Sequence, residues 1–305
     1  MLTYEQLKHL YEREQSSFYL LDTERLVSNY IGLLHAFRSR YEPVIIGYSY
    51  KTNYVPYLCQ TLHSLGAYAE VVSRLEYDLA RKLGVSPEQI IFNGPLKTGE
   101  DTRLALEEGS ILNLDSFSEI EWVTEYARDH PKREVQIGLR VNFDLREQGV
   151  SPLQNGYDVS RFGFCVENGN FQSALETLLM HANIRIVGLH GHFSTNRSLA
   201  VYERITKQLC SLAKQYLPGP IRYLDVGGGM YGNIPDSFGL SQIPTYDNYA
   251  ETICSVMQEE FGTSDQRPAL ILEPGIALVG DVMEFVCKVI DVKENRDTTF
   301  VLVDG

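Results

Sequence analysis

A lysine directly after an apolar run is the residue in this sequence best placed for covalent chemistry. Lys51 follows Tyr48-Ser49-Tyr50 at the end of a run rich in Val and Ile. Apolar surroundings disfavour the charged form of a lysine, so we expect a lowered pKa for Lys51 and a better amine nucleophile. The alternative is a lysine whose charged end only reaches solvent from the end of a strand. Its position alone leaves both interpretations open.

Three further segments carry groups suited to an anionic or aromatic ligand. His192 is followed by the hydroxyls of Ser194 and Thr195, which suit a phosphate, although a lone histidine is more often part of a core. The glycines 227–229 leave backbone N–H groups free to approach an anion closely. Glu273 could bond a protonated ring nitrogen, or it could be a solvated charge at a strand end.

Each of these segments lies at the end of a short apolar run that favours a β-strand, or directly after one. Eight such runs occur along the chain, at 44–50, 67–73, 90–93, 111–115, 135–141, 184–192, 221–226 and 269–273. Stretches with apolar spacing near 3.6 residues separate them. Eight strands alternating with helices over roughly 230 residues predict an α/β protein with a (β/α)8 TIM-type barrel, and a doubly wound open sheet is the alternative. The carboxyl ends of barrel strands share one face, so the four segments would meet there.

Segments at both chain ends predict parts of a second β-domain. A short strand at 18–21 precedes a helix over 23–41, and two further strands are expected at 283–292 and 299–303. Because the sequence stops directly after an apolar strand, we expect the rest of this domain to be absent from it. The predicted division is an N-terminal segment with the first β-domain strand, the barrel, and the start of the C-terminal β-domain, at 1–22, 23–281 and 282–305.

The composition excludes several classes of protein. The 305 residues carry a formal charge of −13, which disfavours nucleic acid or an anionic membrane as a partner. The five cysteines are scattered and form no C-x-x-C motif, so we expect reduced thiols and no metal site. The N-terminus lacks the apolar centre of a signal peptide, and no apolar run approaches the length of a membrane span. We therefore expect a cytoplasmic protein.

In combination, the motifs resemble one family, the pyridoxal 5'-phosphate (PLP)-dependent decarboxylases, which include the diaminopimelate, ornithine and arginine decarboxylases. Tyr48–Asn53 is similar to that family's YAVKAN segment. The other matching segments follow in family order, at 69–73 with Glu76, 91–95 with Lys97, 114–116, 139–142, 161–163, 192–195, 227–229 and 273–275. The resemblance runs from about Phe18 to Gly305, and it implies a barrel like that of alanine racemase.

The resemblance also implies a role for each site residue. Lys51 would hold PLP as a Schiff base, and His192 would stack on the cofactor ring. Glu273 would bond the ring nitrogen and keep it protonated, which strengthens the ring as an electron sink. Arg140 would lie near the cofactor's phenolate side. The cofactor phosphate would be held by the remaining residues, Thr195, Gly227, Gly228, Gly229 and Gly275.

The sequence departs from the family pattern near the substrate. The arginine that usually follows EPG is Ile276, which would still lie beside the cofactor, and the HIGSQ segment reads HFSTN. We therefore expect a small-molecule substrate, an amino acid or amino-acid conjugate other than diaminopimelate, and a role in a specialised pathway. The long segments 143–160 and 231–246 follow the fifth and seventh strands and could carry this difference, or be disordered insertions.

The resemblance further implies a homodimer with shared active sites, completed by residues beyond the barrel. For a chain of these 305 residues alone we therefore expect weak or absent activity. Three alternatives remain: a PLP-dependent racemase, a silent PLP-binding homologue and an S-adenosylmethionine methyltransferase. Glu273 argues against the racemase, because in racemases the ring nitrogen of the cofactor generally pairs with arginine. Segment 224–229 resembles a methyltransferase motif, but only 76 residues follow Gly229, which are too few for the rest of such a domain.

Overall fold

Eight parallel strands form a closed barrel in the computed structural model, which describes residues 2–154, 156, 159–234, 239–240, 242–264 and 266–305. The hydrogen-bonded order is β5-β4-β3-β2-β10-β9-β8-β6, and pairing of β5 with β6 closes the ring. The predicted barrel is confirmed, and closure excludes the open sheet. The strands are β2 (Val44–Ser49), β3 (Tyr68–Val71), β4 (Ile90–Phe92), β5 (Ile111–Leu114), β6 (Val135–Asn142), β8 (Ile184–His190), β9 (Tyr223–Asp225) and β10 (Ala269–Leu272). A two-residue strand, β7 (Phe164–Cys165), extends β6 at its carboxyl end.

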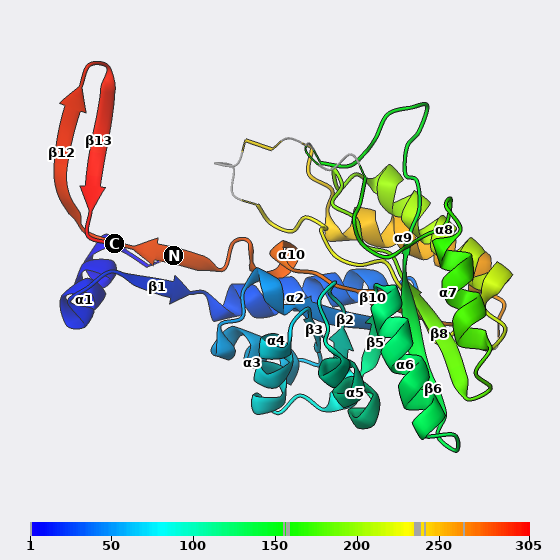
Figure 1. Cartoon of the computed structure of the whole chain (residues 1–305). Helices are drawn as coiled ribbons and strands as arrows, with labels where there is room; N and C mark the ends of the chain where they lie inside the picture. The colour runs from blue at the N-terminus through cyan, green and yellow to red at the C-terminus, as the bar shows by residue number, and fades with distance from the viewer. Residues whose placement is uncertain (1, 155, 157–158, 235–238, 241, 265) are drawn as a thin grey trace.

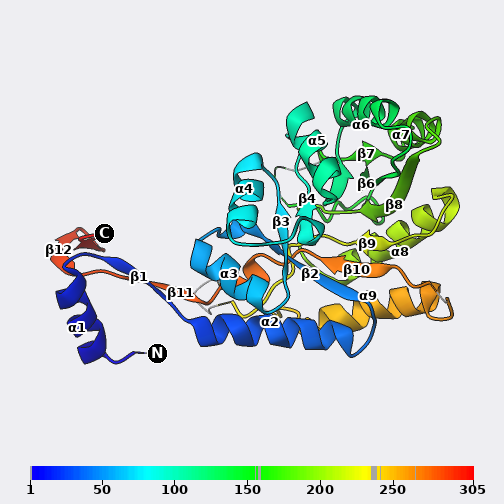
Figure 2. The same ribbon diagram turned by 90° about the horizontal axis from the view of Figure 1, so that it is seen from below.

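Helices surround the barrel as an outer layer (Figures 1 and 2). In α2 (Thr23–Arg38), Leu26, Tyr30, Leu33 and Phe37 recur at helical spacing and are buried, which explains why one face packs inward. The remaining helices are α3 (Pro56–Ser64), α4 (Arg74–Lys82), α5 (Gly99–Glu108), α6 (Phe117–Asp129), α7 (Asn170–Leu179), α8 (Leu199–Tyr216), α9 (Tyr246–Phe261) and the short α10 (Ile276–Val279). Two 3₁₀ turns add η1 (Tyr50–Thr52) and η2 (Pro87–Gln89). Among the described helices, none has the length and apolarity that crossing a bilayer requires.

A tyrosine fills the barrel interior near the amino ends of the strands. Tyr223 is buried between β8 and β10, and its ring lies against two glycines on neighbouring strands. A Cβ at Gly188 would stand 2.6 Å from the ring carbon Cδ2 of Tyr223, and a Cβ at Gly138 would overlap its hydroxyl. The glycines therefore make the space that the large ring occupies.

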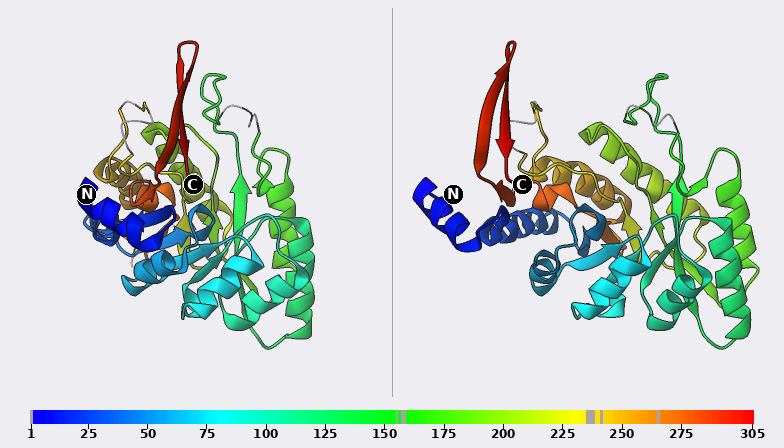
Figure 3. Two further views of the ribbon diagram at one scale, coloured as in Figure 1. Left: turned by 90° about the vertical axis from the view of Figure 1, so that its left-hand side faces the viewer. Right: turned by 60° about the vertical axis from the view of Figure 1, so that its left-hand side comes forward.

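The chain ends form antiparallel pairs outside the barrel. The predicted strand β1 (Phe18–Leu21) pairs with β11 (Met283–Val286). The prediction of one strand over 283–292 is wrong, because the chain changes partner after β11. The next strand, β12 (Val289–Asn295), pairs with β13 (Thr298–Val303) in a hairpin that stands away from the barrel (Figures 1 and 3). An N-terminal helix, α1 (Tyr4–Glu14), was not predicted.

Candidate active site

A cavity of about 260 Å³ opens at the carboxyl ends of the barrel strands. Lys51 and Thr52 reach it from the end of β2, and residues after β8, β9 and β10 complete its wall. It brings together every residue predicted to bind the cofactor except Arg140 and Gly227, namely Lys51, His192, Thr195, Gly228, Gly229, Glu273, Gly275 and Ile276. The four segments singled out in the sequence therefore meet in one place.

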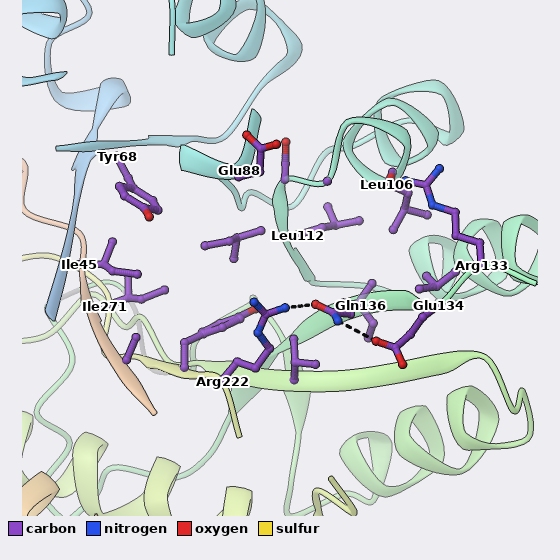
Figure 4. Close-up of a pocket in the computed structure, with 18 of the residues that line it drawn as sticks. Ile45, Tyr68, Glu88, Leu106, Leu112, Arg133, Glu134, Gln136, Arg222 and Ile271 are labelled. Atoms are coloured by element: carbon purple, nitrogen blue, oxygen red, sulfur yellow. Dashed lines mark hydrogen bonds between the residues drawn. The ribbon is translucent and has the colours of Figure 1, made fainter. Parts of the chain in front are cut away.

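A larger cavity of about 520 Å³ lies at the opposite, amino-terminal end of the strands (Figure 4). Its inner wall includes Ile45 and Ile271, and a hydrogen-bonded row of Arg222, Gln136 and Glu134 crosses its rim. In barrel enzymes this end serves stability and the opposite end carries the chemistry. The smaller cavity is therefore the candidate active site.

Lys51 is exposed to this cavity but is not an uncharged amine. Its Nζ lies 2.6 Å from Oε2 of Glu70, which projects from the neighbouring strand β3. Burial opposes the charge on Lys51, but attraction to Glu70 and Glu273 outweighs it and raises the lysine pKa. The expected lowering of this pKa is wrong, because the apolar sequence neighbours of Lys51 do not reveal a carboxylate supplied by another strand. The lysine side chain is 42% exposed, so a small molecule in the cavity can reach it.

Glu273 is a buried carboxylate at the end of β10, and its neighbours keep it ionised. Its Oε2 lies 3.3 Å from Nε2 of His190, and Oε1 accepts a hydrogen bond from Asn93. Burial opposes its charge, but His190, Lys51 and a hydrogen bond from Asp225 hold its pKa well below the usual range. Burial and the adjacent Glu273 raise the pKa of Asp225. Asp225 therefore carries the proton and Glu273 carries the negative charge.

His190, Asp225 and Glu273 also have the residue types of a metal site. One ligand atom from each lies within 4.8 Å of the others, and all three residues are buried. The pairing of the ionised Glu273 with its protonated neighbour Asp225 and with His190 accounts for this grouping without an ion. The expectation of no metal stays a prediction.

His192 presents a neutral imidazole ring to the cavity. Its Nδ1 accepts a hydrogen bond from the backbone N–H of Gly228 at 3.1 Å. Burial, with smaller effects of Arg140 and Lys51, lowers the histidine pKa from 6.5 to about 3. The ring lies parallel to that of His190, with 6° between the planes and 6.4 Å between the centroids. A flat, uncharged ring can pack against another aromatic ring without the cost of burying a charge.

Glycine backbone forms part of the cavity wall. Gly229 has a left-handed φ of +93°. A Cβ at Gly228 would overlap the carbonyl oxygen of Glu273, and one at Gly275 would overlap the hydroxyl of Thr52. Only glycine allows these strand ends to lie so close together, and their backbone can then approach an anionic group.

Arg140 lies behind the cavity wall. It is 5% exposed, and its Nη1 is 3.2 Å from Oδ1 of Asp115. Its Nη2 donates to the carbonyl oxygen of His192 at 3.1 Å, while the guanidinium packs over Phe162, 4.4 Å from the ring centroid. The described contacts thus give Arg140 a part in holding the segment of His192, and its predicted contact with a cofactor stays a prediction.

The loop after β6 also reaches the cavity, as the sequence predicted. Gln154 lines the cavity wall, and its backbone N–H donates to the carbonyl oxygen of Ser194 at 2.9 Å. A second backbone bond joins Asn196 to Pro152 at 2.8 Å. The other predicted loop, 231–246, lies partly outside the described residues, at 235–238 and 241.

Comparison with known proteins identifies the family of this chain. Residues 29–280 match the pyridoxal-binding domain of the pyridoxal-dependent decarboxylases. The chain belongs to this family. It is 31% identical to a probable chloroplastic diaminopimelate decarboxylase of Oryza sativa subsp. japonica, over 96% of this chain and 58% of that protein. Identity to the diaminopimelate decarboxylase of Methanocaldococcus jannaschii is 28%, over 97% and 68% of the two chains.

Solved structures of family members share the fold. The crystal structure of the M. jannaschii diaminopimelate decarboxylase superposes with a TM-score of 0.86 at 27% identity, covering 97% of this chain and 69% of that one. A point mutant of the Helicobacter pylori diaminopimelate decarboxylase, complexed with L-lysine, gives 0.80 at 25% identity, covering 98% and 72%. The chain thus spans between about half and three quarters of the length of these relatives.

Three residues beside the cavity were not predicted to act in the site. They are Glu70, Asn93 and His190, which are buried within a barrel strand or directly after one. A polar side chain inside an otherwise apolar barrel strand is the signal that could have identified them, because burying such a group without a partner is costly.

Proposed function

We propose that this chain is the catalytic barrel of a PLP-dependent amino-acid decarboxylase. The observation that carries the proposal is the single cavity at which Lys51, His192, Glu273 and the glycine backbone meet. Family membership supports the same reaction. The fit to PLP rests on four complementary features: an exposed amine, a flat neutral ring, an ionised buried carboxylate and backbone too crowded for any Cβ.

Lys51 is the lysine that we propose to bind the cofactor's aldehyde as a Schiff base. Its ammonium form is stabilised by Glu70 at 2.6 Å, so it must lose a proton before it can attack a carbonyl carbon. Glu70 is positioned to take that proton. Ser49 also donates a hydrogen bond to Glu70, which keeps the carboxylate turned towards the amine.

Glu273 is the group that we propose to hold a proton at the cofactor's ring nitrogen. PLP, when bound, supplies the conjugated ring that accepts the electron pair left when CO2 departs. An ionised carboxylate stabilises a protonated ring nitrogen, whereas a neutral one would not. The proton on Asp225 and the contact with His190 keep Glu273 in that ionised form.

Ile276 supports a substrate other than diaminopimelate. This residue begins α10 at the cavity wall and offers an apolar surface. An isoleucine cannot pair with a second carboxylate of a substrate, because it has no hydrogen-bond donor. We therefore propose an amino acid or amino-acid conjugate that presents an uncharged group at this point.

The parts of the chain outside the barrel support a larger assembly. We propose that residues 1–22 and 282–305 belong to a second β-domain, since β1 and β11 pair with each other and the β12–β13 hairpin exposes Val289, Phe300 and Leu302. A cytoplasmic homodimer with shared active sites is also proposed, on the resemblance alone. Sedimentation of the full-length protein tests the dimer.

Covalent labelling tests the central proposal. The protein is incubated with PLP, reduced with borohydride and digested, and the modified peptide is identified by mass. We expect the label on Lys51, no label there in Lys51→Ala, and unchanged labelling in Lys82→Ala, which alters a lysine on the outer helix α4. Strong labelling that persists in Lys51→Ala would refute the assignment.

The reaction is tested by CO2 release from a panel of D- and L-amino acids and meso-diaminopimelate, with the full-length protein. We expect CO2 from at least one amino acid, and a lower kcat/KM with diaminopimelate than with the preferred substrate. Racemisation without CO2 release would replace the decarboxylase proposal. Diaminopimelate as the best substrate would contradict the argument from Ile276.

A further inference from the structure

An arginine outside the motifs lines the same cavity. Arg197 lies in the segment between β8 and α8, two residues after Thr195. It contributes to the cavity wall together with Lys51, Gly229 and Ile276. Neither the catalytic roles proposed above nor the strand-end motifs make use of it.

The backbone of Arg197 is held in an unusual conformation. Its φ is +62°, in the left-handed region, which costs a residue with a side chain about 1–2 kcal/mol. Two hydrogen bonds fix it there: its N–H donates to Oγ1 of Thr195 at 3.2 Å, and its carbonyl oxygen accepts from the hydroxyl of Tyr249 at 2.8 Å. A non-glycine residue kept in this region by its surroundings is a candidate for function.

The same supports connect Arg197 to the glycine backbone. Tyr249 packs edge-on against Tyr202, with 5.2 Å between the ring centroids. The hydroxyl of Tyr202 donates to the carbonyl oxygen of Gly228 at 2.8 Å. Two buried tyrosines on α8 and α9 therefore fix Arg197 and Gly228 relative to each other, on the Thr195 side of the cavity.

The side chain of Arg197 is positioned by stacking, and among the described residues none accepts a hydrogen bond from its guanidinium. Its guanidinium lies over the ring of Tyr231, 4.8 Å from the centroid. Over the part of the chain that the structure describes, no carboxylate lies within 4.0 Å of it, whereas the other cation of the cavity, Lys51, is paired with Glu70. A stacked guanidinium presents its N–H groups in one plane, a geometry that matches a phosphate or carboxylate oxygen pair.

We propose that Arg197 binds the phosphate group of the cofactor, beside Thr195 and the glycine backbone. This inference rests on the proposed function, because it needs PLP in the cavity. The phosphate is favoured over a substrate carboxylate because Arg197 is tied through the two tyrosines to Gly228 and through its own N–H to Thr195, all on one side of the cavity. Arg197 thus supplies the positive charge that Ile276, which follows β10, does not.

The test compares PLP with pyridoxal, which lacks the phosphate. Both are titrated by visible absorbance into cofactor-free wild type, Arg197→Met and Arg197→Lys. Losing a hydrogen bond to a charged group should raise the Kd for PLP about tenfold to a hundredfold in Arg197→Met, with less than about threefold change for pyridoxal. Arg197→Lys should recover part of the loss, because lysine keeps the charge but not the planar fork.

Arg185→Met is the matched control, since it removes the same charge from the amino end of β8, where the side chain is exposed. Its Kd for PLP should match that of wild type. Equal weakening of PLP and pyridoxal in Arg197→Met, or no weakening of either, would overturn the proposal. The melting temperature of each variant shows whether it is folded when its Kd is measured.

A second comparison separates the phosphate from a substrate carboxylate. L-lysine and cadaverine differ only in the carboxylate, and each is titrated into PLP-saturated wild type and Arg197→Met. If L-lysine alone binds more weakly while the ratio of PLP to pyridoxal affinity is unchanged, Arg197 binds the carboxylate and the phosphate assignment is wrong. Borohydride labelling of Lys51 in the wild type does not test the role of Arg197. If wild-type Lys51 is not labelled, the proposed function has failed, whatever Arg197 binds.

Discussion

The pH dependence of the free energy of unfolding tests whether His192 is held neutral in the folded protein. Its pKa is lowered from 6.5 to about 3 in the folded protein, so between these values the unfolded chain binds a proton that the folded protein does not. Stability is therefore present above pH 6.5 and is lost as the pH falls towards 3. At about pH 5 the loss relative to about pH 7.5 is about 1.5 pH units at 1.36 kcal/mol each, or about 2 kcal/mol.

His192→Asn keeps an acceptor near the N–H of Gly228 but cannot titrate in this range. Urea unfolding of both proteins at the two pH values, followed by the fluorescence of the single tryptophan, Trp122, gives two free energies of unfolding for each. Every other titrating group is shared, so the difference between the two pH dependences isolates His192. We expect wild type to lose about 2 kcal/mol more than His192→Asn on acidification. Equal losses would show that the ring is not held neutral, and the reasoning about a flat uncharged surface would fail with it.

Two further predictions concern the barrel. Gly188→Ala should destabilise the protein by about 1–3 kcal/mol, because the new methyl overlaps the enclosed ring of Tyr223, while Gly219→Ala, with open space at its Cβ, should be nearly neutral in the same urea titration. Lys97→Met should cost about 3–5 kcal/mol, because it leaves Glu119, 3.0 Å from the lysine and equally buried, without its partner. The double variant Lys97→Met/Glu119→Gln should be more stable than Lys97→Met. If it is less stable, the two charges are not compensating each other.

The barrel could be predicted from the sequence because its strands are marked in two ways. They are buried on both faces and read as continuous apolar runs, and helical spacing resumes between them. The chain ends were predicted less well, because strands there are short and their partners are set by distant contacts. The run 283–292 shows no break in composition, yet β11 pairs with β1 and β12 with β13.

The N-terminal helix α1 carried a signal that could have identified it. Thr3 caps the helix by accepting from the N–H of Gln6, and the Gln6 side chain accepts in turn from the N–H of Thr3. This pattern of threonine followed three residues later by glutamine is visible in the sequence. The helix has no buried residue, so the apolar period that identified the barrel helices gave no help.

The residues that line the site were predicted from the sequence, but the charge state of Lys51 was not. Motif positions located the residues that line the cavity, since strand ends of a barrel must meet on one face. The pKa of Lys51 was predicted in the wrong direction because Glu70, 19 residues later, enters from the adjacent strand. Charge balance depends on which side chains project inward from strands buried on both faces, and in such strands the sequence lacks the alternation that would reveal it.

Hydrogen bonds through the barrel interior explain how these charges are oriented. The hydroxyl of Tyr223 donates to Oδ1 of Asn113 at 2.7 Å, and Nδ2 of Asn113 donates to Oδ1 of Asn93 at 2.8 Å. Each amide accepts on its oxygen, so the nitrogen of Asn93 must face the other way, where it donates to both Glu70 and Glu273. The amide of Asn93 thereby orients one oxygen of each carboxylate. The tyrosine that the two barrel glycines accommodate thus sets the direction of a chain ending at the carboxylates that flank the cavity, which makes the packed interior a determinant of the chemistry above it.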